Sequence, residues 1–162
     1  MINFREHSDE DIDLRVKWLN DPEVNIYLVD DNNHLTNKVE QEEWMEKYKK
    51  SEDKLFYTIM DDIKSIGVIG LSNIDYDKGS ANLFIMIGEK EYWSRGYGEK
   101  AIDFIISKAK ERKIRKITLE VNRNNKNALK LFEKTGFIEI GNSDQEIEMV
   151  LSVKSDGLTS VT

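Results

Sequence analysis

The sequence predicts an α+β fold built on a mixed, mostly antiparallel central sheet with about four helices. Apolar and β-branched residues gather in three short segments, at 55–60, 65–73 and 81–87, and the links between them are too short to hold a helix. Short links join antiparallel neighbours, so these segments predict a three-stranded meander. After residue 97 the spacing of apolar residues alternates between that of a helix and that of a strand. The second half therefore predicts strands and helices in alternation beside the meander.

The region before the meander is predicted to hold one strand and two helices. Residues 3–6 are the strand, and Ser8 or Asp9 can cap the first helix, whose apolar positions follow a helical spacing. Pro22 ends that helix and favours a further short one, because proline is tolerated in a first helical turn. Asn37 caps the second helix, which runs to residue 50 after a polar loop.

The elements after the meander follow from the same patterns. An Asp-Lys-Gly turn at 77–79 marks the hairpin between the second and third meander strands. Gly136 marks the end of the last helix. The later helices and strands are predicted, in chain order, at 97–112, 114–121, 124–135, 137–140 and 147–153.

Length and composition exclude several classes of protein. With 162 residues, 39% of them hydrophobic, the chain is long enough for one domain with a buried core, which we place at residues 1–154 ahead of a polar tail at 155–162. The absence of cysteine excludes a disulfide scaffold, a cysteine-ligated zinc site and a thiol nucleophile. No apolar run approaches the roughly 18 residues of a membrane-spanning helix, and the first residues lack the pattern of an export signal. We therefore expect a cytoplasmic protein without a membrane partner.

Charge is distributed unevenly along the chain. The net charge is −7, but residues 92–134 hold 12 Lys or Arg against 5 Asp or Glu. A basic block in an acidic chain is typical of an anion-binding site or of a solvated helix face, and charge alone leaves both open. A small polyphosphate ligand fits better than nucleic acid, because phosphate backbones would repel the molecule as a whole.

Residues 92–101 hold the most informative motif. They leave a predicted strand and enter a helix, and Gly96 and Gly98 allow a tight turn and a close approach of the backbone to a ligand. The helix that follows offers free N–H groups and the positive end of its dipole, while Arg95 and Lys100 add charge. The motif predicts a phosphate or pyrophosphate site, or else an ordinary glycine turn. The spacing also matches a dinucleotide-binding fingerprint, which the three antiparallel strands ahead of it exclude.

Two motifs in the predicted order of elements resemble the GCN5-related N-acetyltransferase (GNAT) superfamily. The first is Trp93-Ser94-Arg95-Gly96-Tyr97-Gly98, in which Trp93 replaces the Gln or Arg usual in the family. The second begins at Leu119-Glu120-Val121, continues through Asn125 and Ala128, and ends at Gly136-Phe137. A Tyr-Trp pair at the loop and the segment Trp18-Leu19-Asn20-Asp21-Pro22-Glu23-Val24 are similar to the branch that includes ribosomal-protein and spermidine acetyltransferases.

The resemblance implies the acyl-CoA N-acyltransferase fold, with a sheet splayed between the third meander strand and the strand at 114–121. It also implies acetyl-CoA as co-substrate and no metal, with the pantetheine arm in the splay and the pyrophosphate on the glycine loop. Amides of that arm can pair with strand edges that a splay opens. The coenzyme-binding residues that the resemblance implies are Met86, Ile87, Trp93, Ser94, Arg95, Gly96, Tyr97, Gly98, Glu99, Asn125, Ala128 and Phe132.

The catalytic base departs from the family pattern. Members often carry a Glu on the third meander strand, and the matching position here is Asn82, which cannot accept a proton. The resemblance offers Glu120 as another base. A surface ion pair with Lys116 or Arg123 is the other reading of Glu120, and both stay open.

The general acid departs from the pattern as well. The usual tyrosine of the last helix is Phe132, which cannot protonate a thiolate. Three explanations stay open: water acts as the acid, another tyrosine reaches the site, or the protein is a coenzyme-binding sensor or interaction module with little turnover. The tyrosines considered are Tyr27, Tyr92 and Tyr97.

We therefore expect an N-acetyltransferase that acts on a primary amine, such as a polyamine, a protein N-terminus or another small amine. A homodimer stays open. Acidic residues of the early helical region would attract a cationic acceptor or form a solvated face. His7 and His34 fall in polar segments, which predicts surface residues rather than metal ligands. The acidic residues are Asp30, Asp31, Glu40, Glu42, Glu43 and Glu46.

Overall fold

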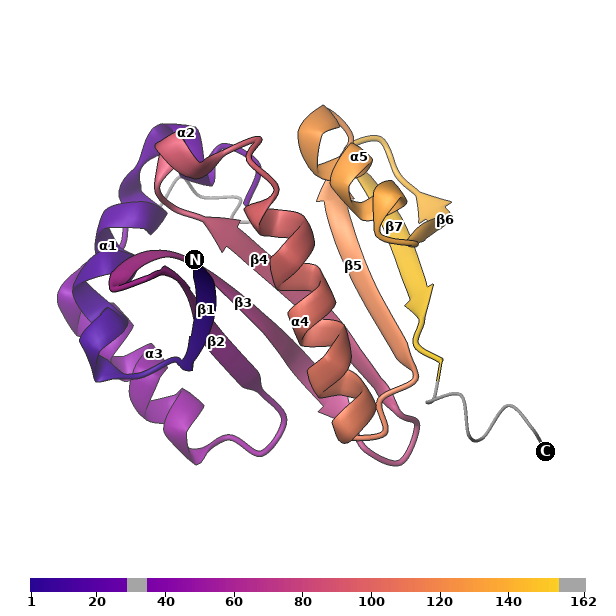
Figure 1. Ribbon diagram of the computed structural model, residues 1–162, viewed down its shortest axis with the longest axis horizontal. Helices are drawn as coiled ribbons and strands as arrows, with labels where there is room; N and C mark the ends of the chain where they lie inside the picture. Colours follow the sequence, from indigo (N-terminus) through magenta and orange to yellow (C-terminus); the bar gives the residue numbers. More distant parts are fainter. Residues whose placement is uncertain (29–34, 155–162) are drawn as a thin grey trace.

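The computed structural model describes residues 1–28 and 35–154 (Figure 1). A seven-stranded sheet runs through it in the order β1-β2-β3-β4-β5-β7-β6. The strands are β1 (Ile2–Glu6), β2 (Leu55–Asp61), β3 (Lys64–Asp75), β4 (Ser80–Ile87), β5 (Lys116–Asn122), β6 (Ile138–Asn142) and β7 (Glu146–Ser152). The helices are α1 (Ile12–Asn20), α2 (Pro22–Asn25), α3 (Lys38–Lys50), α4 (Tyr97–Glu111) and α5 (Lys126–Lys134), with 3₁₀ turns η1 (Asp9–Asp11) and η2 (Lys90–Tyr92). The α+β class and the mostly antiparallel sheet are confirmed.

One pair of neighbouring strands is parallel and short. β4 and β5 pair only at Ser80–Lys116, Ala81–Ile117 and Asn82–Thr118. Beyond these pairs β4 stays bonded to β3 up to Ile87, while β5 stays bonded to β7 up to Asn122. The two strands therefore diverge, as Figure 1 shows, and the expected splay is confirmed. We use "splay" for the gap between residues 83–87 and residues 119–122.

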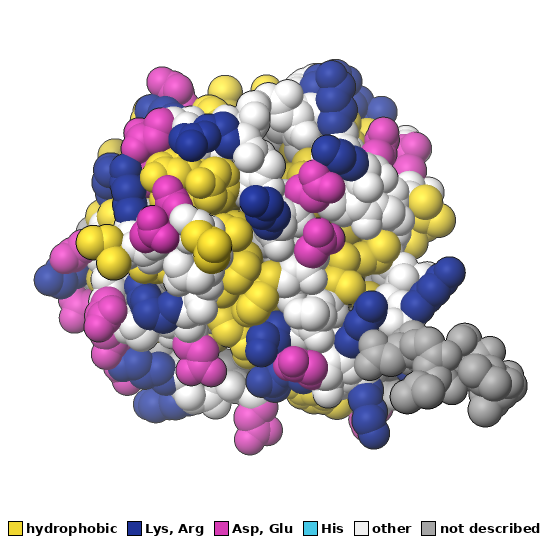
Figure 2. All heavy atoms as spheres, viewed as in Figure 1, with side chains coloured by type: hydrophobic (Ala, Val, Ile, Leu, Met, Phe, Trp, Pro, Cys, Tyr) yellow, Lys and Arg dark blue, Asp and Glu magenta, His cyan; other side chains and the backbone are white. Residues whose placement is uncertain are grey.

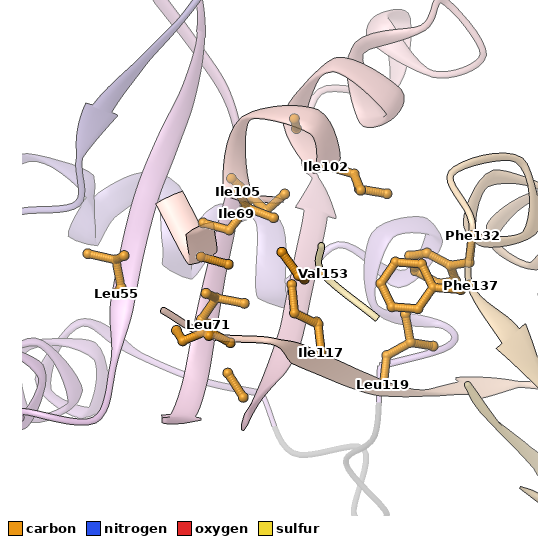
Figure 3. Close-up of a cluster of buried hydrophobic side chains, with 14 of the residues drawn as sticks. Leu55, Ile69, Leu71, Ile102, Ile105, Ile117, Leu119, Phe132, Phe137 and Val153 are labelled. Carbon is orange, nitrogen blue, oxygen red and sulfur yellow. The ribbon is translucent and has the colours of Figure 1, made fainter. Parts of the chain in front are cut away.

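Helices cover the two faces of the sheet unequally. α4 contributes Ile102, Ile105 and other fully buried residues to the main core, together with alternate residues of β3 and β5 (Figure 3). Figure 1 shows α4 and α5 on the same side of the sheet. On the opposite face, Trp18 of α1 packs with Phe56, Val68 and Met86 in a second cluster that α3 borders. The β5 end of that second face carries no helix among the described residues.

The turns form where the sequence predicts them. Gly79 adopts a φ of 67° in the β3–β4 hairpin, a left-handed conformation that suits glycine. Asn37 caps α3 by accepting a hydrogen bond from the Glu40 backbone N–H at 2.9 Å. In the described part of the chain, no helix is long and apolar enough to cross a membrane. The predicted tail at 155–162 and Asp30, Asp31 and His34 lie outside the described residues.

The prediction of a surface position for His7 is wrong. His7 is only 5% exposed, and its Nδ1 lies 2.8 Å from Thr58 Oγ1 and 3.2 Å from a carboxylate oxygen of Asp11. Arg15 donates to His7 Nε2 at 3.0 Å. Burial, opposed by Asp11 and aided by Arg15, lowers the pKa of His7. The polar residues around His7 interact with one another inside the fold, which the polarity of the segment alone does not reveal.

Candidate functional site

The glycine loop turns through two left-handed residues before α4 begins. Ser94 has a φ of 59° and Gly96 a φ of 86°. Gly96 is the N-cap of α4, and no side chain caps the first helical N–H groups. A Cβ at Gly96 would have no other atom within 4 Å, so the space beside this backbone is open. Uncapped N–H groups at the start of a long helix, reached through open space, suit an anionic group such as a pyrophosphate.

Gly98 has a different role in the fold. A Cβ at Gly98 would lie 2.9 Å from Cδ2 of Leu131 in α5, so its absence lets α5 pack closely against α4. Glu99 of the same turn forms an ion pair with Lys134 of α5 at 3.0 Å. Gly96 therefore allows the loop conformation, and Gly98 allows the contact between two helices. The motif alone did not indicate the role of Gly98.

The exposed Arg95 side chain lies beside two aromatic rings. Its guanidinium carbon is 5.0 Å from the ring centre of Tyr92 and 5.7 Å from that of Tyr97. Tyr92 in turn donates to Asp61 at 2.9 Å, and this hydrogen bond raises the pKa of Tyr92. A raised pKa makes Tyr92 a weaker proton donor, which disfavours it as the general acid.

The register of β4 decides which backbone groups face the splay. Gly88 N–H donates to the Ile66 carbonyl of β3 at 2.8 Å, and the next pair along the ladder is Gly67–Ile87. Hydrogen-bonded and non-hydrogen-bonded pairs alternate in an antiparallel ladder, so the N–H and C=O of Ile87 point away from β3. Ile87 and, by alternation, Ile85 direct their backbone groups to the splay. Met86 pairs with Val68 instead, and its side chain lies in the Trp18 cluster. Of the two predicted residues, only Ile87 therefore presents its own backbone to the splay.

Trp93 lies at the end of this edge. Its Nε1–H donates to the Ile87 carbonyl at 2.8 Å, and the residue is 39% exposed. The indole thus binds the one splay-facing carbonyl closest to the glycine loop. The replacement of the usual Gln or Arg by Trp therefore supplies a contact within the chain.

Glu120 lies at the narrow end of the splay. The last β4–β5 pair brings Thr118 Oγ1 to Asn82 Oδ1 at 2.7 Å, and Glu120 is two residues further along the same face of β5. It is exposed, whereas its neighbours Leu119 and Val121 are buried on the face that α4 covers. Neither of the ion pairs that the sequence left open for Glu120, with Lys116 or with Arg123, forms among the described residues, and Arg123 instead donates to the Ser143 carbonyl at 2.6 Å.

α5 places the remaining predicted residues on the other side of the splay. The Asn125 side chain accepts from the Ala128 N–H at 3.2 Å and so caps the helix. Phe132 is 6% exposed and packs edge to face against Phe137, with 5.7 Å between ring centres (Figure 3). Lys126 and Lys130 are exposed, and Figure 2 shows basic side chains over α5 with acidic side chains interspersed among them.

The acidic residues of α3 do not border the splay. α3 packs over β2, where Trp44 and Tyr48 contact Phe56, and its exposed carboxylates Glu42, Glu43 and Glu46 line a surface hollow of their own. β2 is separated from β5 by two strands. No group of three or more His, Asp or Glu residues is arranged for a metal ion in the part of the chain that the structure describes.

Comparison with known proteins points to one family. The family model described as "Acetyltransferase (GNAT) domain" matches residues 2–138. Acetyltransferase PseH of Campylobacter jejuni is 26% identical over 159 residues, which cover 95% of this chain and 93% of that protein. An N-acetyltransferase 9-like protein of Nematostella vectensis is 25% identical and covers 94% of this chain and 69% of that protein.

Solved structures share the fold. Spermidine N-acetyltransferase from Vibrio cholerae, in complex with CoA and spermine, superposes with a TM-score of 0.85 at 21% identity, over 94% of this chain and 95% of that one. A domain from Methanocaldococcus jannaschii superposes with a TM-score of 0.82 at 19% identity, over 94% and 98%. The family match spans β1 through the start of β6 and so includes the splay and the glycine loop. This chain therefore belongs to the GNAT family and is an acetyl-CoA-dependent N-acetyltransferase.

Proposed function

We propose that this enzyme transfers acetyl from acetyl-CoA to a small cationic primary amine, with Glu120 as the general base. The observation that carries the proposal is the position of Glu120, which is exposed at the narrow end of the splay and on the face away from α4. A coenzyme arm that enters the splay would bring its thioester to this end. An amine that approaches from the open face of β5 then meets the carboxylate and the thioester together.

The coenzyme-binding part of the proposal rests on two features of the chain. The uncapped N–H groups of α4, beside the open space at Gly96, would hold the pyrophosphate, together with the backbone of Trp93, Ser94 and Arg95. The edge of β4 that faces the splay would pair with the pantetheine amides through the backbone of Ile85 and the N–H of Ile87, whose carbonyl accepts from Trp93. Asn125, Ala128 and Phe132 border the same gap from α5, where the Asn125 oxygen already caps the helix and its amide NH₂ remains to donate.

Proton transfer needs a group that accepts the ammonium proton before attack. Glu120 can take it directly or through one water, because the carboxylate is exposed and lies at the end where pairing of β4 with β5 stops. Asn82, at the position usual for the base, accepts a hydrogen bond from Thr118 and has no basic group to offer. We assign the protonation of the departing thiolate to water, because the Phe132 ring has no acidic proton and the Tyr92 hydroxyl donates its hydrogen bond to Asp61.

The acceptor class follows from charge. The chain carries a net charge of −7, and Glu120 has Glu148 of β7 as its cross-strand partner. Two carboxylates side by side on a strand pair repel each other, and a cationic amine between them relieves that repulsion. A polyamine fits this description, and the Vibrio cholerae structural neighbour is a spermidine N-acetyltransferase solved with spermine.

We also propose that the chain self-associates. Ile138 and Ile140 of edge strand β6 are 63% and 48% exposed, which is unfavourable for a strand that faces water alone. A dodecameric structure is known for the Vibrio cholerae spermidine N-acetyltransferase. Light scattering across a range of protein concentrations tests this part, and a monomer at all concentrations contradicts it.

The test of the proposed function compares the turnover of the parent and of the Glu120→Gln variant with a panel of polyamines, amino sugars and N-terminal peptides. Release of the coenzyme thiol measures turnover. Gln keeps the shape of Glu but removes its basicity, so turnover at neutral pH should fall by roughly 10²-fold or more. The deficit should shrink at high pH, where free amine is plentiful. Glu148→Gln is the matched control, because it removes the same charge from the neighbouring strand and should alter the KM for the amine without this pH dependence.

Two outcomes would contradict parts of the proposal. Equal turnover of Glu120→Gln and the parent from pH 6 to 9 would show that Glu120 is a surface residue of β5 and not the general base. Binding of coenzyme A without turnover of any amine in the panel would favour a coenzyme-binding module instead.

A further inference from the structure

The segment between β4 and the glycine loop is held by α1. Trp18 of α1 is 1% exposed, and its indole lies directly against Gly88. A Cβ at Gly88 would lie 2.1 to 2.4 Å from three atoms of the indole ring, so no other residue fits this contact without displacing one of the two elements. This contact fixes the end of β4 relative to α1.

Polar contacts strengthen the same connection. Trp18 Nε1–H donates to Glu89 Oε2 at 2.7 Å, and Lys17 Nζ lies 3.2 Å from the same oxygen. The Glu89 side chain is 13% exposed, and Lys64 approaches its other oxygen at 3.8 Å. Burial opposes ionisation of Glu89, but the hydrogen bonds from Trp18 and Lys17 outweigh it, so the pKa of Glu89 is lowered. Glu89 is thus a charged acceptor, and the Trp18 N–H is one of its hydrogen-bond donors.

α2 holds the next residue of the segment. Lys90 Nζ lies 2.9 Å from Asp21 Oδ2 and 3.4 Å from Glu23 Oε1. Asp21 also accepts from the Glu23 backbone N–H at 3.0 Å and so caps α2. The acidic and aromatic residues of the Trp18–Glu23 motif therefore contact residues 88–90, a role that the sequence pattern did not indicate.

Residues 88–90 lead directly into the glycine loop. Trp93 N–H donates to the Lys90 carbonyl at 3.0 Å, Tyr92 N–H donates to the Glu89 carbonyl at 3.0 Å, and the Trp93 indole returns to the Ile87 carbonyl. A displacement of Glu89 thus moves both the last splay-facing carbonyl of β4 and the first residue of the loop. The same two features carry the proposed coenzyme site.

We propose that Trp18, acting through Gly88 and Glu89, is a positioning residue for coenzyme binding. It packs against the side of Met86 that faces away from the splay and contacts no residue of the glycine loop, but it fixes the segment that joins them. The inference rests on the proposed placement of the coenzyme on the glycine loop.

The test measures binding of coenzyme A by calorimetry and steady-state kinetics on folded variants. Trp18→Phe keeps most of the ring packing but removes the N–H donor, and Glu89→Gln keeps an acceptor but removes its charge. We expect Trp18→Phe to weaken coenzyme A binding about three- to tenfold, the scale of one ordinary intramolecular hydrogen bond. The kcat at saturating acetyl-CoA should stay near that of the parent, because the reacting end of the splay is unchanged.

The matched control is Trp44→Phe, the same substitution in the neighbouring helix α3. Trp44 stacks on Tyr48 and Arg15 and contacts none of residues 88–90, so a loss of stability without a loss of affinity is expected there. The effects of Trp18→Phe and Glu89→Gln should not add in the double variant, because the first removes the hydrogen bond between these two side chains and the second weakens the same bond.

Gly96→Val separates this inference from the proposed function. If Gly96→Val weakens coenzyme A binding but Trp18→Phe and Glu89→Gln both bind like the parent, Trp18 has no positioning role. If Gly96→Val also binds like the parent, the coenzyme does not lie on the glycine loop and both proposals fail. Should Trp18→Phe not fold, Glu89→Gln decides the matter alone, since Glu89 lies at the surface end of the contact.

Discussion

The buried His7 predicts that this protein loses stability as the pH falls below neutrality. His7 is only 5% exposed, accepts from Arg15 at Nε2, and has its pKa lowered mainly by burial. An unfolded chain binds a proton at His7 near its ordinary pKa of 6.5, whereas the folded chain does not. The unfolded state then holds more protons than the folded state, so the free energy of unfolding falls as the pH drops below about 6.5.

The charged groups around His7 set the size of the effect. Asp11 Oδ2 lies 3.2 Å away and favours protonation, but it also binds Arg5, at 2.8 Å through Oδ1. Arg15 donates to the ring nitrogen that would have to take the proton, and its own charge opposes a second one. One proton gives at most about 1.4 kcal/mol for each pH unit between the two pKa values, so a fall of about 1 kcal/mol between pH 6.5 and 5.5 is the expected scale.

Urea unfolding at pH 7.5, 6.5 and 5.5 measures this directly. His7→Gln removes the titrating group, so the difference in unfolding free energy between parent and variant should narrow as the pH falls. A His34→Gln background leaves His7 as the single histidine of the sequence, and its titration can then be followed by NMR. A difference that is constant over this range, or an NMR pKa at or above 6.5, would refute the reasoning.

Two further predictions concern α5. Phe132→Ala should lower the free energy of unfolding by about 3–5 kcal/mol, the range for truncating a buried Phe, while the kcat at saturating acetyl-CoA changes little; a steep fall in kcat with unchanged coenzyme affinity would show instead that the ring orders the reacting centre. Gly98→Val should lower the free energy of unfolding by about 1–3 kcal/mol through overpacking against Leu131, and Leu131→Ala in the same chain should restore part of that loss. If urea titrations show no restoration, Gly98 acts through its backbone alone.

The order of the elements was predictable because it depends on local signals. The Asn37 cap, the turn at Gly79 and the alternation of buried and exposed residues in β5 are all set by side chains within a few positions of one another. The element boundaries differ from the predicted ones by a few residues, as with α5, which begins at Lys126 rather than at residue 124. The splay followed from the family resemblance, since no local signal indicates where two strands stop pairing.

The candidate site was predicted less completely, because its parts meet only in three dimensions. The glycine loop and Glu120 could be named from motifs. The backbone direction of Met86 could not, because it depends on the register with β3, and a shift of one residue would reverse it. The acidic residues expected near the acceptor illustrate the same limit, since α3 places Glu42, Glu43 and Glu46 two strands away from the β4–β5 gap.

The sequence by itself determined the fold class, the glycine loop between a strand and a helix, and the absence of a tyrosine at position 132, because each depends on residue type and local spacing. Only the tertiary structure decided that His7 is buried, that Gly98 serves the contact with Leu131, and that Trp18 holds Gly88 and Glu89. Trp18 and Glu89 are 71 residues apart along the chain. A contact of that range forms only when the sheet brings α1 against the end of β4, and no pattern within either segment encodes it.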